Sequence, residues 1–254
     1  MNILVSNDDG IDARGIHELA AALAGEGDIY ISAPDSQKSA AAHSITVHNP
    51  ITIKEVDFER ASGALEVKGT PADCVKLGIR YFKAKGIDID FVFSGINHGG
   101  NLGTDTLYSG TVSAAIEGAL CKKPSVAVSV NSTHPTHFDY SCELAIETLH
   151  AMVEHDMGII IMNINAPDLP RDEVRGVKYT RLGVREYDEW FQPEDTVSGE
   201  TQYKYQGKPV VYKSRNSGID VIADQEKYAS ITPLKCDLTN YELLEDIKKW
   251  RIYK

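Results

Sequence analysis

The sequence contains few cysteines, no excess of positive charge and no long apolar segment. Its four cysteines lie far apart and form no CxxC pair, which argues against a disulfide framework or a zinc site; they are Cys74, Cys121, Cys142 and Cys236. No apolar run is long enough to span a bilayer, and the N-terminus carries no leader pattern of basic and then apolar residues. We therefore expect a soluble, cytoplasmic protein with buried, reduced thiols and no membrane partner.

The charge balance is acidic, because 37 Asp and Glu residues outnumber 26 Lys and Arg residues and give a formal net charge of −11. Binding to a nucleic-acid polymer needs a concentrated basic surface, so this balance disfavours that class of partner. A small anionic substrate remains compatible, because a metal ion and backbone amides can neutralise a phosphate. With 254 residues, 42% of them hydrophobic and 25% charged, the chain resembles an ordinary globular protein with a large core.

Segments typical of buried strands alternate with segments of helical periodicity along the first two thirds of the chain. Strands are expected at 3–5, 28–33, 64–68, 87–94, 125–130 and 158–165. Helices are expected from a cap at Asp12 to Leu23, from a cap at Thr70 to residue 85, over 109–120 and over 139–155. This alternation predicts an α/β fold with a Rossmann-like, doubly wound, mostly parallel sheet and helices on both faces. A hairpin of 44–48 with 51–56 is expected at the edge.

The composition changes after about residue 170, a boundary that sequence patterns define to within roughly 2–4 residues. We expect a catalytic core over 1–170 and, packed on it, a C-terminal extension over 171–254. The extension should contain antiparallel strands at 177–182, 201–205 and 209–213, segments that return to the sheet at 217–224 and 228–233, and a closing helix over 240–250. A projecting ribbon suggests assembly more than chemistry, so a homo-oligomer is expected.

An acidic pair follows the first predicted strand. Asp8 and Asp9 fall in the turn between this strand and the next helix, where open α/β sheets bind ligands. Two neighbouring carboxylates repel each other, so a bound cation is the simplest compensation if both face the same point. Alternatively, one Asp is a solvated turn residue and the other caps the helix. These residues alone leave both interpretations open.

A glycine-rich stretch is the second unusual feature. Four glycines fall within nine residues, and two asparagines lie among them: Gly95, Asn97, Gly99, Gly100, Asn101 and Gly103. A helix is then expected to start at Ser109-Gly110-Thr111, where unpaired N–H groups and the helix dipole could hold a phosphate without a lysine. The stretch matches neither the GxGxxG pattern nor the P-loop, and the alternative is a flexible loop with a serine cap.

The side chains near the acidic pair offer oxygen atoms to a metal ion. The candidates are the carboxylates of Asp8 and Asp9, the hydroxyl of Ser39 and the amide oxygen of Asn97. Oxygen ligands select Mg²⁺, Mn²⁺ or Ca²⁺. A metal beside an anion-binding helix start suggests phosphoryl chemistry, in which the ion would activate a water and neutralise phosphate oxygens. His43 and His98 are candidate acid or base helpers, although a histidine in a loop is more often simply solvated.

Five motifs together resemble the SurE family, the stationary-phase survival-protein nucleotidases. They are SNDDGIDARGI at 6–16, SQKSAAAHSIT at 36–46, GTPADCV at 69–75, SGINHGGNLGTDTLYSGTVSAAIEGA at 94–119 and ASITPLKCDLT at 229–239. The resemblance runs in the same order over nearly the whole chain. It implies a metal-dependent phosphatase that hydrolyses nucleoside 5′-monophosphates, and it leaves hydrolysis at the 3′ position open. It also implies a Rossmann-like core and a C-terminal part that forms a homodimer or homotetramer.

The same resemblance implies roles for particular residues. The ligands of the divalent ion, Mg²⁺ or Mn²⁺, would be Asp8, Asp9, Ser39 and Asn97, and the catalytic residues would be Asp8, Asp9 and Asn97. The phosphate would be held by Asn101, Ser109, Gly110 and Thr111. The segment over 186–206 matches no motif, so the base preference and the exact assembly are not predicted.

Two other classes of protein place acidic residues after a first strand. In a haloacid-dehalogenase-like phosphatase, Asp8 or Asp9 would be a covalent nucleophile, but such enzymes carry DxD where this chain has NDDGID. A receiver or nucleotide-binding regulator would bind without hydrolysis. A receiver needs an acceptor Asp after its third strand, where this chain has Ser94-Gly95, and this chain is about twice the commonest domain length. We therefore prefer a metal-activated water as the attacking group.

Overall fold

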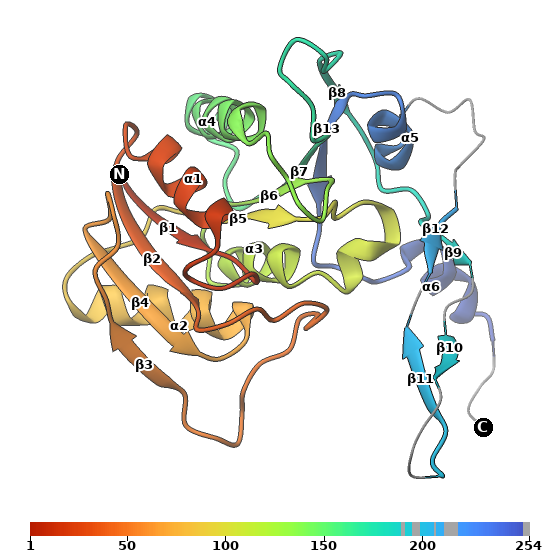
Figure 1. Cartoon of the computed structure of the whole chain (residues 1–254), viewed down its shortest axis with the longest axis horizontal. Coiled ribbons are helices and arrows are strands. Elements are labelled where there is room, and N and C mark those ends of the chain that lie inside the picture. Colours follow the sequence, from red (N-terminus) through yellow and green to blue (C-terminus); the bar gives the residue numbers. More distant parts are fainter. Residues whose placement is uncertain (189–190, 195–198, 206, 211–217, 251–254) are drawn as a thin grey trace.

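A nine-stranded sheet forms the centre of the molecule, with the strand order β3-β4-β2-β1-β5-β6-β7-β13-β8 (Figure 1). The computed structural model describes residues 1–188, 191–194, 199–205, 207–210 and 218–250. The strands of this sheet are β1 (Asn2–Ser6), β2 (Asp28–Pro34), β3 (Thr52–Glu55), β4 (Gly63–Lys68), β5 (Phe91–His98), β6 (Ser125–Val130), β7 (Ile161–Ala166), β8 (Val177–Tyr179) and β13 (Ala229–Leu234).

Two helices cover each face of the sheet. Helices α1 (Arg14–Leu23) and α4 (Asp139–Glu154) lie on one face, and α2 (Pro71–Ala84) and α3 (Gly110–Leu120) lie on the other (Figure 1). Because both faces are covered, the central strands are buried over most of their length, and Ile3, Leu4 and Val5 of β1 are fully buried. The predicted α/β fold with a doubly wound, mostly parallel sheet is confirmed.

The strand order places one particular point of the sheet at its centre. Strands β4, β2, β1, β5, β6 and β7 are parallel neighbours. The chain runs outward from β1 through β2 to β4, and then returns to β5 on the other side of β1. The order therefore reverses between β1 and β5, and the carboxyl ends of these two strands flank the crevice in which such sheets bind ligands.

The helix starts agree in part with the sequence. Helix α2 begins as predicted at Thr70 and Pro71, with a capping box in which Thr70 Oγ1 accepts from Asp73 N at 3.1 Å and Asp73 accepts from Thr70 N at 3.0 Å. The predicted cap of α1 is wrong. Asp12 does not cap this helix, because a turn from Ala13 N to Gly10 O moves the N-cap to Ala13.

The predicted hairpin of 44–48 with 51–56 is also wrong. Strand β3 pairs instead with β4, antiparallel, and residues 44–48 form no strand. The physical reason is a competing partner: Asp73 accepts hydrogen bonds from the backbone N and the hydroxyl of Thr46, and Thr70 donates to the carbonyl of Ser44. These bonds hold the segment against the start of α2.

The bounds of strand β5 differ from those predicted for it. It begins at Phe91 and continues to His98, so Gly95 and Asn97 belong to the strand and not to the loop that follows. The pairing with β6 shifts between Ser94 and Asn97.

The cysteine thiols differ in burial: Cys74 is buried, whereas Cys121 and Cys142 are half-buried and Cys236 is exposed. The prediction of buried thiols therefore holds for one cysteine.

The C-terminal part contributes to the main sheet and also projects from it. Strand β13 pairs antiparallel with β7 and parallel with β8, so the strand predicted at 177–182 is shorter and is not antiparallel. Helix α5 (Asp220–Gln225) occupies the first predicted returning segment. A hairpin of β10 (Phe191–Glu194) and β11 (Gln202–Tyr205) lies in the chain between β9 (Tyr187–Asp188) and β12 (Lys208–Pro209), which pair with each other. Residues 211–213 of the last predicted strand lie outside the described residues.

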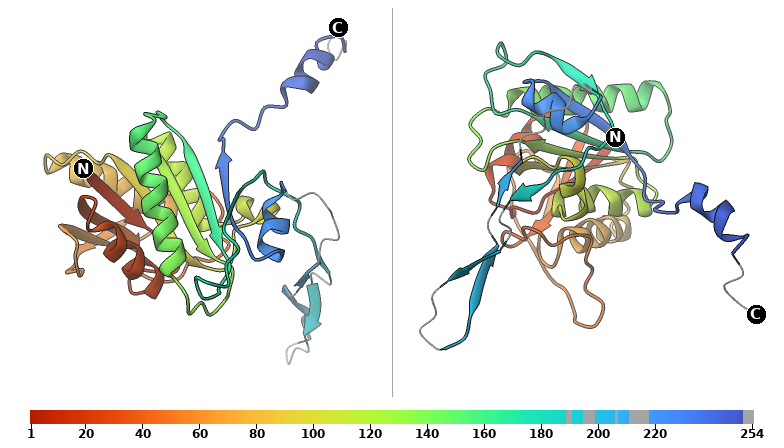
Figure 2. Two further views of the ribbon diagram at one scale, coloured as in Figure 1. Left: turned by 90° about the horizontal axis from the view of Figure 1, so that it is seen from above. Right: turned by 90° about the vertical axis from the view of Figure 1, so that its right-hand side faces the viewer.

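The closing helix α6 (Tyr241–Ile247) is shorter than predicted and buries none of its residues. It stands away from the sheet on an extended segment, as the two views of Figure 2 show. Among the described residues, no helix combines the length and the apolar character that a bilayer crossing requires. The division at residue 170 stays a prediction.

Candidate active site

The acidic pair lies at the carboxyl end of β1, at the point where the strand order reverses. Asp8 is 5% exposed, and Oδ1 accepts a hydrogen bond from the hydroxyl of Thr111 at 2.5 Å. A Cβ atom on Gly110 would lie 2.7 Å from Cβ of Asp8, closer than such atoms approach. The start of helix α3 therefore packs directly on Asp8, and only glycine fits at the contact.

Burial raises the pKa of Asp8 to about 6, and the charge of Asp9 adds to this effect, whereas the hydrogen bond from Thr111 opposes it. A buried carboxylate with a second carboxylate beside it is a favourable environment for a cation, which would stabilise the charged form of Asp8. Among the described residues, no group of three or more His, Cys, Asp or Glu side chains is placed to hold a metal. A cation here would need neutral oxygen ligands beside the two carboxylates.

Asp9 joins the first strand to β5. Its Oδ2 accepts from the backbone N of His98 at 3.1 Å, and its Oδ1 lies 3.3 Å from the donating Nε2 of Gln37. Asn97 precedes His98 on the same strand, and its Nδ2 donates to the carbonyl of Gly99 at 2.7 Å. Because this bond uses the amide nitrogen, the amide oxygen of Asn97 is the atom that can serve as a metal ligand.

Ser39 lies on the loop that follows β2, and its side chain is exposed. Two backbone hydrogen bonds hold this loop: Lys38 N donates to the carbonyl of Asp8 at 2.7 Å, and Ala42 N donates to the carbonyl of Tyr108 at 3.1 Å. Ser39 is therefore one residue from a direct contact with the acidic turn. The role of its hydroxyl as a metal ligand stays a prediction.

The predicted phosphate-binding residues lie at the start of α3 and in the loop before it. The hydroxyl of Ser109 accepts from Val112 N at 3.0 Å, so it caps the helix, as the simpler interpretation of this serine requires. Thr111 is fully buried and directs its hydroxyl to Asp8. Asn101 is buried: its N and Nδ2 donate to Asn165 Oδ1 at 2.7 Å and to Ser129 Oγ at 2.8 Å. Strands β6 and β7 thus fix the asparagine.

The two histidines differ in their surroundings. His43 Nε2 lies 2.9 Å from Oε2 of Glu117, whose Oε1 accepts from Lys76 Nζ at 2.7 Å. Glu117 is 2% exposed; burial acts to raise its pKa, but the bonds from His43 and Lys76 outweigh burial and lower it. His98 is different, because its ring lies 5.9 Å from that of Phe138 and its Nε2 is buried without a hydrogen-bond partner among the described residues.

Sequence patterns did not indicate Glu117 or Lys76 as partners of His43. The only available signal was an acidic residue within the apolar segment that becomes α3, since a buried carboxylate needs a partner.

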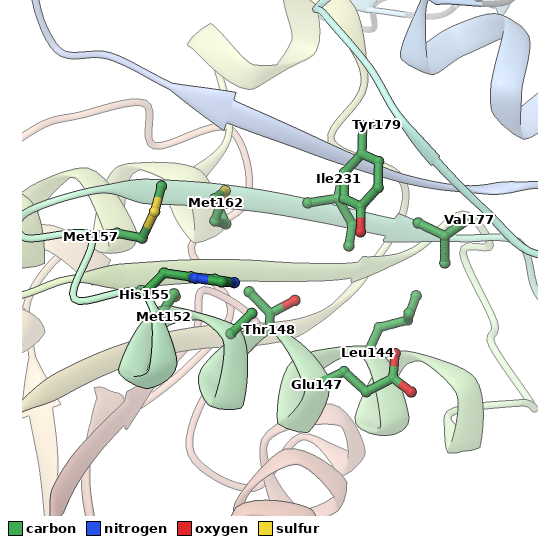
Figure 3. Close-up of a pocket in the computed structure, with 11 residues that line it drawn as sticks. Leu144, Glu147, Thr148, Met152, His155, Met157, Met162, Val177, Tyr179 and Ile231 are labelled. Atoms are coloured by element: carbon green, nitrogen blue, oxygen red, sulfur yellow. The ribbon is translucent and has the colours of Figure 1, made fainter.

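A separate pocket of about 340 Å³ lies between α4 and the far strands of the sheet, and Met152, Met162, Tyr179 and Ile231 are among its lining residues (Figure 3). None of the predicted site residues lines it.

The fold and these side chains define an α/β protein with paired carboxylates beside a helix N-terminus, at the switch point where Rossmann-type sheets bind ligands. A family model described as Survival protein SurE matches residues 3–189. The chain belongs to the SurE family, as its motifs predicted.

Individual relatives cover nearly the whole chain. The 5′-nucleotidase SurE of Pelotomaculum thermopropionicum is 44% identical over 250 residues, 98% of this chain and 95% of the relative. The 5′-nucleotidase SurE of Syntrophomonas wolfei is 42% identical over 251 residues, 98% of this chain and 94% of the relative. The crystal structure of the SurE protein from Aquifex aeolicus superposes with a TM-score of 0.83 at 34% identity, covering 98% and 99% of the two chains.

Proposed function

We propose that the protein is a metal-dependent phosphatase that hydrolyses nucleoside monophosphates, with the 5′-phosphate as its main target. The observation that carries this proposal is the contact of the Asp8 carboxylate with the start of helix α3 through Thr111 and Gly110. This contact brings a cation-binding pair of carboxylates next to an anion-binding helix terminus. The name 5′-nucleotidase SurE, which the relatives bear, supports the same activity.

The residues proposed to hold the divalent ion, Mg²⁺ or Mn²⁺, are Asp8, Asp9, Ser39 and Asn97. The raised pKa of Asp8 and the available amide oxygen of Asn97 fit this role. When bound, the ion supplies positive charge to the phosphate oxygens and lowers the pKa of water. Asp8, Asp9 and Asn97 are the proposed catalytic residues, because they adjoin the point where strand order reverses.

The phosphate is proposed to lie against Asn101, Ser109, Gly110 and Thr111. Helix α3 presents the positive end of its dipole at these residues, which favours negative charge that develops on a phosphoryl group. The anchoring of Asn101 by β6 and β7 supports this placement, since a fixed amide loses little freedom when it binds a ligand. His43, held by Glu117, is a proposed proton carrier.

We also propose a core over 1–170 with an extension over 171–254 that assembles a homodimer or homotetramer in the cytoplasm. Apolar side chains on the projecting elements support this assembly: Phe191 and Tyr203 on the hairpin are each 62% exposed, and Leu243 on α6 is 45% exposed. Exposed apolar groups on elements that project from the sheet are typical of an interface.

The activity is tested by phosphate release from a panel of nucleoside 5′- and 3′-monophosphates with Mg²⁺, Mn²⁺ or EDTA. Asp8→Asn is compared with Asp12→Asn, a matched change four residues away at an exposed position. We expect release that requires a metal and that Asp8→Asn alone abolishes. Release that persists in EDTA, or that is equally fast in the Asp8→Asn variant, would contradict the proposal. The panel also determines the base and the phosphate position.

A further inference from the structure

Arg185, in the C-terminal part of the chain, holds the glycine-rich loop that precedes α3. Nη1 of Arg185 donates to the carbonyl of Gly100 at 3.1 Å and lies 3.1 Å from Oδ2 of Asp105. The side chains of Arg185 and Asp105 are only 14% and 20% exposed. An ion pair with so little exposure is screened less by solvent than an ordinary surface pair. This arginine therefore contacts the loop at two points, a carbonyl and a carboxylate.

Backbone contacts reinforce the same junction. Arg185 N donates to Thr104 Oγ1 at 3.1 Å, and Thr104 Oγ1 in turn donates to the carbonyl of Arg185 at 2.9 Å. Asp220 is fully buried, and its two oxygens accept from Gly103 N at 2.7 Å and Gly183 N at 2.8 Å. Residues 183–185 and the loop 100–105 are thus fastened side by side.

Asp105 connects these contacts between residues 183–185 and the loop 100–105 to the proposed phosphate site. Its carboxylate pairs with Arg185 and accepts a hydrogen bond from the hydroxyl of Tyr187. Its backbone carbonyl accepts from Ser109 N at 3.1 Å and from Tyr108 N at 3.0 Å. One residue therefore joins the guanidinium of Arg185 to the residue that caps α3, and a shift of Asp105 would displace both Ser109 and the loop.

The opposite side of the loop is held by the sheet. The carbonyl of Asn101 accepts from Asn163 Nδ2 at 2.9 Å and from Asn165 Nδ2 at 3.1 Å. Asn101 thus has fixed contacts to β7, whereas Gly100 on one side and Gly103 on the other depend on Arg185 and Asp220. Because glycines give the loop wide backbone freedom, its shape depends on these external contacts.

We propose that Arg185 is a positioning residue for phosphoryl transfer: it sets the geometry of the segment 100–109 and so couples the C-terminal extension to catalysis. The proposal rests on the proposed function, because it assumes that the phosphate lies against this segment. Arg185 acts through Gly100 and Asp105 and does not touch the reacting atoms. A displacement of about 1 Å in such a segment is enough to lower a rate by up to about 100-fold.

The test measures kcat and KM for a nucleoside monophosphate in Arg185→Gln and Arg185→Lys, together with the Tm and the molar mass in solution. We expect Arg185→Gln to lower kcat about tenfold or more, to change KM less, and to leave Tm and mass close to wild type. Arg185→Lys keeps the charge near Asp105 but lacks the planar guanidinium. Its kcat should therefore lie between those of wild type and Arg185→Gln.

Arg171→Gln is the matched control, because Arg171 also pairs with a carboxylate, Glu143, at 2.9 and 3.2 Å and stacks on a tyrosine, Tyr140, at 3.9 Å. Its kcat should equal that of wild type. The double variant Arg185→Gln/Asp105→Asn should be no slower than the slower single variant, as expected for two residues that act as one unit.

Three outcomes would overturn the inference: an Arg185→Gln variant as active as Arg171→Gln, a loss of kcat that occurs only with a lower Tm or a changed mass, or losses that multiply in the double variant. Asp8→Asn, assayed in parallel, separates this inference from the proposed function. If Asp8→Asn abolishes release while Arg185→Gln does not affect it, only the positioning role is wrong. If Asp8→Asn remains active, the proposed site itself is wrong.

Discussion

The hydroxyl of Thr111 donates to Oδ1 of Asp8 although the two residues are 103 positions apart in the chain. This bond opposes the burial and the Asp9 charge that raise the pKa of Asp8 from 3.8 to about 6. Between these two pH values the folded protein binds more protons at Asp8 than the unfolded chain does. The free energy of unfolding of the metal-free protein therefore falls as pH rises through this window.

The first prediction concerns stability without metal. By pH 8 the cost of the charged Asp8 amounts to roughly 3 kcal/mol, from about 1.4 kcal/mol per pKa unit. Asp8→Asn removes this cost and keeps an oxygen that can accept from Thr111. In EDTA we expect the Tm of Asp8→Asn to exceed that of wild type by several degrees at pH 8 and to approach it near pH 3.8.

The same measurement with Mn²⁺ should reverse the order, because an ion that binds only the folded protein stabilises it. Wild type should then gain Tm at pH 8, whereas Asp8→Asn should not. Asp12→Asn serves as the control and should follow wild type throughout. A variant Asp8→Asn that melts below wild type at pH 8 in EDTA would show that the charged Asp8 is not a source of instability.

The second prediction concerns the contact between Gly110 and Asp8. A methyl group at position 110 would lie 2.7 Å from Cβ and 2.8 Å from Oδ2 of Asp8. Gly110→Ala should therefore displace the acidic turn and reduce phosphate release by about 100-fold or more. Gly25→Ala is the control, because a Cβ atom there would have no non-neighbouring atom of the described residues within 4 Å. Equal activity of the two variants would disprove the close contact.

The third prediction tests His43 as a proton carrier. Loss of a general acid or base typically costs about 10²–10⁴ in rate, so His43→Gln should lower kcat by at least about 100-fold. His150→Gln is the control, since His150 Nε2 also lies against a glutamate, 2.7 Å from Glu26 Oε2, on the surface. Identical kinetics of the two variants would leave His43 with only a structural contact to Glu117.

The fourth prediction concerns assembly. Leu238, on the segment leading to α6, is 86% exposed and contributes nothing to the core of one chain. If the projecting elements form the homodimer or homotetramer, Leu238→Asp should shift the molar mass measured by light scattering toward the monomer and leave far-UV circular dichroism unchanged. Asp237→Asn, at the adjacent position, is the control and should keep the wild-type mass. A monomeric wild type would contradict the proposed assembly.

Sequence patterns sufficed for the parts of the fold in which local signals and burial agree. The apolar run Ile3–Val5 indicates a buried strand, and Thr70 with Pro71 indicates a helix start, because each residue acts within its own turn or strand. The partner strand of 51–56 could not be found in this way. Its pairing depends on Asp73, which lies outside the local segment and accepts a hydrogen bond from the backbone N of Thr46.

The site shows the same division. The acidic pair and the glycine-rich stretch are each contiguous in the sequence and can be recognised there. The resemblance to the SurE family implies roles for their residues. The contacts that orient these residues are long-range: His43 meets Glu117 across 74 positions, and Arg185 meets Gly100 across 85. A single chain without relatives carries no pattern for such pairs, so Arg185 and Glu117 emerged only from the folded structure.

The order in which the chain is synthesised matters for the acidic pair. Asp8 and Asp9 are synthesised well before the partners that enclose them: His98 is 89 positions from Asp9, and Thr111 is 103 positions from Asp8. A nascent chain that has not yet reached Thr111 presents the two carboxylates without the start of helix α3, which packs on Asp8. The environment that raises the pKa of Asp8 therefore forms late in biosynthesis, only after the chain has been made as far as Thr111.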